Sequence, residues 1–460
     1  MTTPHDLVDV ALSSTTGDEA VVVVRTSSAA NLRWANNTLT TNGAMTGTEL
    51  TMVSVVDGGQ GPAAGVVSRT VSSPAQVREV VGAADAAARA ARPSPDAAEL
   101  TRGEPHPGFD DLPGVTSVDA LTDIADPLGR AFGRYRDGGR LLYGYAEQDV
   151  STTYVASSTG LRLRHEQPTA SVTMTAKPDD LSDSTWVGQA AETVAGVSVD
   201  ALTEELVRRL SWGRRRIELP AGRYETILPP TAVADLTVYG YFTAGARDAA
   251  EGQTVFGRPG GGTRVGERIA KPGVRLWSDP HQPGLGATPF VVATAGSAAA
   301  SVFDNGLPLT ATDWISDGTL RALGTSRHTA GLTGLPNTPF VDNLSLAVDG
   351  GTGSVDDLVA STDRALLVTC LWYIRQVDPQ TLLLTGLTRD GVYLVEDGRV
   401  VGAVNNFRFN ESPVDLLARF TEAGACVRSV SREWGDYFPR TATPTLRIPD
   451  FNMSSVSQAS

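Results

Sequence analysis

The sequence predicts an α+β protein with an N-terminal β-rich α/β region, a central meander with helices, and a C-terminal domain with a large, mainly antiparallel sheet and helices. Three pairs, Asn305-Gly306, Asp317-Gly318 and Asp397-Gly398, lie between apolar runs, and such pairs are typical of β-hairpins. Helical stripes of apolar residues occur between these strand-like runs. A chain of 460 residues is also long enough for two or three domains with cores of their own.

The first expected domain covers residues 1–92. Its strand-like runs are 20–24, 31–34 and 48–56, and a glycine-rich turn at 57–61 leads into a further run at 63–67. Ser73-Pro74 then opens an alanine-rich helix, because serine is a common N-cap and proline fits the first helical turn. We therefore expect a β-rich unit backed by one helix.

Residues 93–116 are rich in Pro, Gly and acidic side chains and predict a linker or a long surface loop. The central domain is expected at 117–215. It starts with a helical stripe from Leu121 to Tyr135, which Asp126-Pro127 either kinks or divides into two helices. The elements expected after it are strands at 141–146, 152–156, 161–165 and 171–175, and a longer helical region at 182–210.

The C-terminal domain is expected at 216–453, followed by a short tail at 454–460. It begins with a strand at 224–228, after which Pro229-Pro230 opens a helix. The apolar residues that share one face of this helix are Val233, Leu236 and Tyr239. Further along, the capping-box pair Ser354 and Asp357 predicts a second helix that continues to Thr369.

The stretch 385–416 carries the densest set of local signals in the chain. Asp397-Gly398 separates two apolar runs and predicts a hairpin. The alternation after it directs Phe407 and Phe409 towards the core, and Ser412-Pro413 then opens a helix. The polar candidates for a peptide-binding or partner surface are Arg389, Asp390, Asn406, Arg408, Asn410 and Glu411. Hydrogen bonding within the hairpin and at strand ends is the alternative role for all six.

The charge balance excludes some classes of partner. Lys and Arg total 38 against 52 Asp and Glu, a net charge of −14, so the chain is not expected to bind nucleic acid. There is neither a run of 18 apolar residues nor a secretory signal, so no membrane association is expected. Cys370 and Cys426 show no CxxC spacing, which predicts buried free thiols in a reducing compartment and a cytoplasmic protein.

The sequence contains no local motif for a catalytic metal or nucleophile. No two of its five histidines lie within four residues of each other, and neither HExxH nor HExxxH occurs. A GxSxG elbow is also absent, and the glycine-rich stretch 257–262 lacks the GK[ST] ending of a phosphate-binding loop. We expect no metal site in this chain, with a zinc site assembled from distant residues as the alternative.

Several segments together resemble the TldD/PmbA family. In the C-terminal region the family's hairpin pattern stands as Thr385-Gly386, Thr388-Arg389-Asp390-Gly391 and Glu396-Asp397-Gly398. Further similar segments are Asn31 to Asn37, Val265 to Ile269, Leu276 to Pro280 with Asp279, and Phe303 to Gly306. Because the order and the spacing of these segments also agree, the chain is identified as a member of the family over most of its length.

The resemblance also implies a subtype. The family has two types of subunit that pair, and the TldD type holds zinc through HExxxH on a helix and a cysteine near its C-terminus. The corresponding segments here, 232–246 and 432–437, contain neither histidine nor cysteine. The chain therefore resembles the PmbA/TldE-type subunit, with no cofactor of its own and zinc expected in the partner.

The function that this resemblance implies is that of the non-metal subunit in a TldD/TldE-like zinc metallopeptidase complex. In such a heterodimer the chain completes the cavity and holds small or unfolded peptides during proteolysis, and it is inactive alone. The alternative is a homodimeric structural or peptide-binding protein with no peptidase role. An enzyme with a separate site of its own is a third interpretation.

Overall fold

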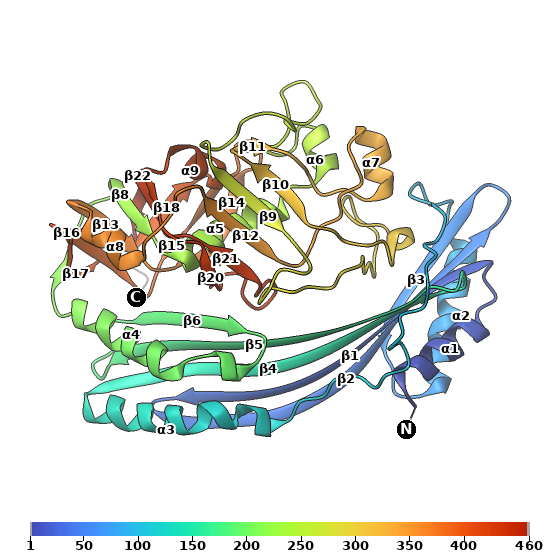
Figure 1. Ribbon diagram of the computed structural model, residues 1–460, viewed down its shortest axis with the longest axis horizontal. Coiled ribbons are helices and arrows are strands. Elements are labelled where there is room, and N and C mark those ends of the chain that lie inside the picture. Colours follow the sequence, from blue (N-terminus) through green and yellow to red (C-terminus); the bar gives the residue numbers. More distant parts are fainter. Residues whose placement is uncertain (1, 458–460) are drawn as a thin grey trace.

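The computed structural model describes residues 2–457 and confirms the predicted α+β class. These residues form nine α-helices and three largely antiparallel sheets. Figure 1 shows a long, curved sheet from the N-terminal half of the chain, with the C-terminal half lying along one side of it. We call residues 2–212 the N-terminal unit and residues 216–457 the C-terminal unit.

The N-terminal unit contains a six-stranded sheet in the order β3-β2-β1-β4-β5-β6. Neighbouring strands are antiparallel throughout it. The strands are β1 (Glu19–Ala35), β2 (Thr38–Asp57), β3 (Pro62–Thr70), β4 (Arg140–Ser157), β5 (Arg162–Pro178) and β6 (Thr185–Ala191). Strands from both of the domains expected at 1–92 and 117–215 therefore share one sheet.

The strands of this sheet are longer than the apolar runs that predict them. The runs 20–24 and 31–34 both belong to β1, because the polar residues between them pair with β2 on one side and β4 on the other. Strand β4 likewise contains the predicted runs 141–146 and 152–156, and β5 covers most of the runs 161–165 and 171–175. The helix predicted at 182–210 is wrong in its first half, since β6 pairs there with β5.

Four helices cover one face of the sheet: α1 (Pro4–Ser14), α2 (Pro74–Ala90), α3 (Thr122–Asp137) and α4 (Val199–Trp212). Even-numbered residues of β1 point to them, with Val22 beneath α1 and α2 and Trp34 beneath α3. Ser73 caps α2 as predicted, accepting a hydrogen bond from the backbone of Gln76. Helix α3 is a single helix that contains Pro127.

The C-terminal unit contains two sheets. The larger has the order β14-β15-β18-β22-β8-β13-β16-β17-β7, with β19 paired to β22. Its strands are β7 (Arg216–Ile217), β8 (Gly222–Leu228), β13 (Arg364–Val368), β14 (Leu371–Asp378), β15 (Leu383–Thr388), β16 (Val392–Glu396), β17 (Arg399–Val404), β18 (Phe407–Glu411), β19 (Glu422–Ala423) and β22 (Leu446–Val456). The smaller, ordered β11-β10-β9-β12-β21-β20, comprises β9 (Val274–Ser278), β10 (Thr312–Ser316), β11 (Thr319–Leu320), β12 (Leu344–Val348), β20 (Val427–Ser429) and β21 (Thr441–Thr443).

Helix α5 (Pro230–Phe242) forms the centre of this unit. Every residue from Ala232 to Val238 is buried, because β8, β20, β21 and α9 surround the helix. This differs from the one-sided stripe predicted for it, and an apolar surface on all sides is typical of a core helix. The shorter helices are α6 (Ala246–Ala250), α7 (Arg327–Thr333), α8 (Val355–Ala360) and α9 (Pro413–Arg419).

Two C-terminal predictions need correction. The capping box of Ser354 and Asp357 forms, but α8 ends at Ala360, and the residues after it form β13 between β8 and β16. Asn305 does not turn a hairpin, because it follows a 3-10 turn and its side chain bonds to the backbone of Ala293. The predicted hairpin between β10 and β11 is confirmed.

The stretch 385–416 folds largely as predicted. Strands β16 and β17 form a hairpin, and Asp397 and Gly398 have the positive φ angles, +48° and +74°, that a tight hairpin turn requires. Phe407 and Phe409 are fully buried. Helix α9 follows, but Ser412 makes no side-chain cap, because its hydroxyl donates to the carbonyl oxygen of Thr381.

The connection at 93–116 is a long surface loop anchored by two buried side chains, Leu100 and Phe109, which pack on the N-terminal sheet. Cys370 is buried as predicted, whereas Cys426 is exposed, which corrects the expectation of two buried thiols. Strand β22 extends into the expected tail at 454–460, of which residues 458–460 lie outside the described part. No helix within residues 2–457 has the length and apolar character needed to cross a membrane.

Candidate functional site

The side chains in the central parts of strands β4 and β5 alternate between the helix-covered face of the sheet and a polar face on the other side. Even-numbered residues such as Ala146 and Val172 are buried beside α3 and α4. Successive side chains of a strand point to opposite faces, so the odd-numbered residues form a polar face on the other side. These polar residues are Glu147, Asp149, Ser151 and Thr153 on β4, and Gln167, Thr169, Ser171 and Thr173 on β5.

This face lines a cleft of about 870 Å³ between the two units, which we call the polar cleft. Arg25, Arg33 and Tyr145 complete its floor. The C-terminal unit forms the opposite wall with Thr288, Asp342, Gly435, Asp436, Tyr437, Pro439 and Arg440. The polar cleft therefore depends on how the C-terminal unit is seated above the sheet.

Apolar contacts at both ends of the sheet face seat the C-terminal unit. At one end Val21 packs with Phe290 and Phe303. At the other end Trp186 packs with Cys370 in a small buried cluster. Because the apolar contacts lie at the ends, the polar middle of the face stays open as the cleft.

Charged groups of both signs face the polar cleft. The guanidinium of Arg33 lies 5.9 Å from the centre of the Tyr145 ring. Burial, together with the adjacent Glu147, raises the pKa of Tyr145 to about 12 and also raises the pKa of Asp149. Burial lowers the pKa of Arg440. Hydroxyls, an amide and partly desolvated charges of both signs suit the binding of a polar, extended molecule.

A second polar arrangement lies on α5, where the side chain of Asp235 is completely buried. Its carboxylate accepts hydrogen bonds from the hydroxyl of Ser431 at 2.6 Å and from the backbone nitrogens of Glu433 and Leu371, each at 3.1 Å. Burial raises the pKa of Asp235 to about 7, and the three donors limit that rise by stabilising the charged form. The carboxylate thus ties α5 to β14 and to the segment after β20.

Aromatic contacts reinforce the same junction. The indole nitrogen of Trp434 donates to the backbone oxygen of Asp235 at 2.9 Å, and its ring lies edge-on to Tyr239 at a centroid distance of 5.4 Å. The carboxylate of Glu433 accepts hydrogen bonds from the backbone nitrogens of Tyr373 and Ile374 at 2.9 and 3.1 Å. The segment 431–434 is therefore locked to α5 on one side and to β14 on the other.

The residues at this junction do not fit a hydrolytic zinc ion. Such an ion needs three nitrogen, sulfur or oxygen ligands and one open position for water. Both carboxylate oxygens of Asp235 are occupied by donors, and Ser431, Glu433 and Trp434 offer no imidazole or thiolate. Across residues 2–457 there is no group of three or more His, Cys, Asp or Glu side chains that could hold one ion.

Three of the six residues singled out from the sequence lie at the contact between the units. Asp390 is buried and pairs with Arg432, and it accepts a hydrogen bond from Ser184 of the N-terminal unit. Arg389 is half-buried beside it, and its carbonyl oxygen accepts from the thiol of Cys370. Asn406, with Asp390, lines a cavity at this contact.

The other three residues lie on β18, away from the polar cleft. Arg408 is exposed and donates to the hydroxyl of Thr385 at 3.4 Å. Glu411 is buried and pairs with Arg419 of α9 at 2.7 Å, which ties α9 to β18. Asn410 is half-buried, and its side-chain oxygen has no hydrogen-bond partner in the described structure. The structure therefore divides the six predicted residues between two separate places.

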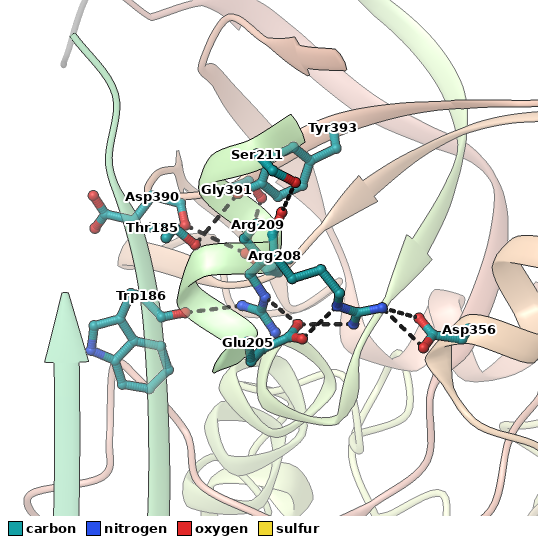
Figure 2. A network of polar contacts seen from close by, with 11 residues as sticks. Thr185, Trp186, Glu205, Arg208, Arg209, Ser211, Asp356, Asp390, Gly391 and Tyr393 are labelled. Carbon is teal, nitrogen blue, oxygen red and sulfur yellow. Dashed lines mark hydrogen bonds and ion pairs between the residues drawn. The ribbon is translucent and has the colours of Figure 1, made fainter. Parts of the chain in front are cut away.

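Figure 2 shows how α4 fastens the two units. Glu205 lies between Arg208 and Arg209 on α4, with distances of 2.6 Å to both. Arg208 reaches Asp356 of the C-terminal unit at 2.8 Å, and Arg209 donates to the carbonyl oxygen of Trp186 at 2.9 Å. This helix thus joins the end of the N-terminal sheet to α8.

Cation–π contacts of Arg432 also hold the two units together. The guanidinium of Arg432 lies between the rings of Trp186 and Trp372, at 5.3 and 4.9 Å from their centres. Because Trp186 belongs to β6 and Trp372 to β14, this single arginine bridges the two units. The bridge and the Asp390 pair hold the wall of the polar cleft at a fixed position above the sheet.

Solved structures share this two-unit fold over nearly the whole chain. TldE from Thermococcus kodakarensis aligns with a TM-score of 0.78 at 18% identity, over 97% of this chain and 99% of that one. A protein described as a candidate modulator of DNA gyrase from Bacteroides thetaiotaomicron aligns with a TM-score of 0.77 at 14% identity, over 99% and 100%. A similarly described protein from Thermotoga maritima gives 0.74 at 17%, over 98% and 100%. No curated protein matches the sequence.

The chain therefore has the class of fold in which a C-terminal unit of two sheets packs on one face of a long N-terminal sheet. Residues 221–455, just over half of the 460, match the PmbA/TldA metallopeptidase C-terminal domain. The chain belongs to the TldD/PmbA family, as the sequence motifs predicted.

The residues of the polar cleft were missed by the sequence interpretation. Their signal is the run of polar or aromatic odd positions from Tyr145 to Thr153 and from Gln167 to Thr173, which alternates with apolar even positions fully in β5 and only in part in β4, where Gln148 and Thr152 are polar. Breaking each strand into two short runs concealed this alternation. The role of Arg432 carries no local signal, because its partners Trp186 and Asp390 lie far away in the sequence.

Proposed function

We propose that this chain is the subunit without zinc in a two-subunit peptidase of the TldD/TldE kind. In this proposal a TldD-type partner carries the zinc, and the polar cleft of this chain holds the peptide that the partner cuts. The chain is inactive alone, because catalysis by zinc needs ligands that its own residues do not provide.

One observation carries the proposal: α5 and the segment 431–434 meet at Asp235. The family resemblance assigns the zinc ligands of the TldD type to these same two regions of the chain. Here a hydrogen-bonded carboxylate and the ring of Trp434 fill the junction. The geometry supports a shared scaffold in which this chain has a structural junction where the partner type has a metal centre.

The polar cleft supports a role in holding substrate. Its floor is built from strands whose odd-numbered side chains offer hydroxyls and charges of both signs. An extended, unfolded peptide exposes backbone donors and acceptors as well as charged side chains, and such a floor can bind both. Small or unfolded peptides suit a cleft of about 870 Å³ better than a folded protein does.

The test is to purify the chain alone, a TldD-type partner alone and the two together. We expect the pair to form a stable heterodimer, zinc to be bound only in the partner, and peptide hydrolysis to require both subunits. Stoichiometric zinc or hydrolysis in the isolated chain would contradict the proposal. A chain that forms only a homodimer in the presence of the partner would instead favour a structural or peptide-binding protein.

A further inference from the structure

A second cavity, of about 430 Å³, lies on the other side of the Asp390 contact, and we call it the joint pocket. It is lined from the N-terminal unit by Lys177 and Asp183, and from the C-terminal unit by Arg216, Tyr393 and Asn405. None of its lining residues belongs to the polar cleft. The joint pocket is therefore a separate place where both units can contact one ligand.

The carboxylate of Asp183 forms no ion pair with the residues that the structure describes. Its one hydrogen bond within these residues comes from the backbone nitrogen of Ser184 at 2.8 Å. Burial raises its pKa, the nearby Arg216 lowers it, and the carboxylate of Asp390 raises it further. A half-buried carboxylate with free acceptor capacity is a receptor for an ammonium or another donor.

Two cations on the same wall are also unpaired. The side chains of Lys177 and Arg216 make neither an ion pair nor a hydrogen bond with any residue in the range 2–457, although both line the joint pocket. Neither cation forms an ion pair with the carboxylate of Asp183. The pocket thus presents positive and negative charge held apart, an arrangement complementary to a molecule with charges at its two ends.

An unsatisfied amide adds an independent indication. The side-chain oxygen of Asn405 accepts a hydrogen bond from the backbone nitrogen of Leu219 at 2.7 Å. Its side-chain nitrogen is buried and has no partner in the described structure. Buried donors nearly always have a hydrogen-bond acceptor. We therefore expect this nitrogen to donate to a ligand oxygen or to a water in the joint pocket.

Two of the other wall residues, Asp390 and Tyr393, are held in place by the protein itself and keep the joint pocket open. Asp390 is fully engaged by Arg432 and Ser184, and it does not need a ligand. The ring of Tyr393 is packed edge-on against Trp212 at 4.9 Å, which fixes an apolar side of the pocket. Unsatisfied groups and rigid walls together distinguish this cavity from a gap between loops.

We propose that the joint pocket binds a small zwitterion of amino-acid or dipeptide size. Its ammonium group pairs with Asp183, its carboxylate pairs with Arg216 and Lys177, and its carbonyl oxygen accepts from Asn405. A simple anion is disfavoured by Asp183, and a simple cation by the two basic residues. Because the ligand contacts both units, its binding stabilises their contact by mass action. The inference does not depend on a peptidase role for the polar cleft.

The test is calorimetric titration of the full chain with glycylglycine. Two matched probes each lack one charge: N-acetylglycylglycine lacks the ammonium group, and glycylglycine amide lacks the carboxylate. We expect glycylglycine to bind. Each probe should bind with a dissociation constant at least about tenfold higher. Absence of binding at millimolar glycylglycine, or equal binding of all three, overturns the proposal.

Variants locate the site. Asp183→Asn and Arg216→Gln should each weaken glycylglycine binding about tenfold. The control is Asp179→Asn, because Asp179 is an exposed neighbour that does not line the joint pocket, and it should leave binding unchanged. Ser171→Trp, which fills the polar cleft, should also leave binding unchanged. Loss of binding in Ser171→Trp but not in Asp183→Asn would assign the ligand to the polar cleft and overturn the inference.

Discussion

The hydroxyl of Ser431 donates a hydrogen bond of 2.6 Å to the buried carboxylate of Asp235. This contact joins the central helix α5 to a segment almost two hundred positions further along the chain. Because Leu371 and Glu433 donate to the same carboxylate, one side chain satisfies two backbone groups and a hydroxyl. The junction is therefore sensitive to any change in Asp235.

Replacing Asp235 with alanine should destabilise the protein by about 3 kcal/mol, because three buried donors lose their acceptor. The measurement is the free energy of unfolding in urea. Glu204→Ala is the control, since Glu204 is exposed on α4 and its loss should change stability by no more than about 0.5 kcal/mol. Equal effects of the two changes would show that the junction does not contribute to stability.

Stability should also depend on pH through Asp235. Its folded pKa, about 7, lies above the ordinary value of 3.8 for an aspartate, so the folded state binds an extra proton between these pH values. The stabilising contribution is therefore fully present below about pH 4 and is lost as the pH rises to about 7. Asp235→Asn cannot titrate, so the stability of the natural chain relative to this variant should rise as pH falls through that window. A difference that is independent of pH would contradict the assigned pKa.

The bridge at Arg432 allows a double-mutant cycle. Arg432→Met should cost about 3 to 5 kcal/mol, because it leaves the buried carboxylate of Asp390 without its cation. Adding Asp390→Asn removes that charge, so the double variant should be more stable than the sum of the two single changes predicts. The free energies of unfolding of the four proteins give the coupling. Additive effects would mean that the ion pair between Arg432 and Asp390 does not contribute to stability.

Local signals predicted the elements whose stabilising contacts are local. The Asp397-Gly398 turn, the alternation of Phe407 and Phe409 and the capping pair of Ser354 and Asp357 all depend on neighbours within a few residues. The family motifs predicted the family, because they compare this chain with a pattern of order and spacing. These features were accessible from the sequence alone.

Elements that form through contacts with residues distant in the sequence could not be predicted from local patterns. Residues 185–191 form β6 because β5 pairs with them, and residues 364–368 form β13 because β8 and β16 enclose them. Helical periodicity in the sequence cannot report that competition. The polar cleft needed both the length of β4 and β5 and the seating of the C-terminal unit, neither of which follows from local pattern.

Backbone strain at Tyr373 gives a fourth prediction. This residue has a φ of +53° although it is not glycine, and its backbone is held by Glu433. Tyr373→Ala keeps the strain and removes the exposed ring, whereas Tyr373→Gly removes both. The glycine variant should therefore be more stable than the alanine variant by about 1 kcal/mol, as thermal and urea unfolding can measure. The reverse order would mean that the residue carries no strain.

The polar cleft can be tested by filling it. Ser171 lies on the polar face of β5 and lines the cleft, and a tryptophan there projects into the space where we propose that peptide lies. In the heterodimer with a TldD-type partner, Ser171→Trp should lower kcat/KM for peptide hydrolysis by at least about tenfold, because displaced substrate no longer meets the partner's metal in a productive position.

The fold should tolerate this substitution, since the new ring enters a cleft and not a packed core. Thr70→Trp is the matched control, because Thr70 is exposed at the end of the edge strand β3 and does not line the cleft. Both variants should unfold at similar urea concentrations and associate equally with the partner, so that a selective loss of hydrolysis in Ser171→Trp reports on the cleft alone. Undiminished hydrolysis by a folded, associated Ser171→Trp would mean that peptide reaches the metal by a route that avoids the polar face of β4 and β5.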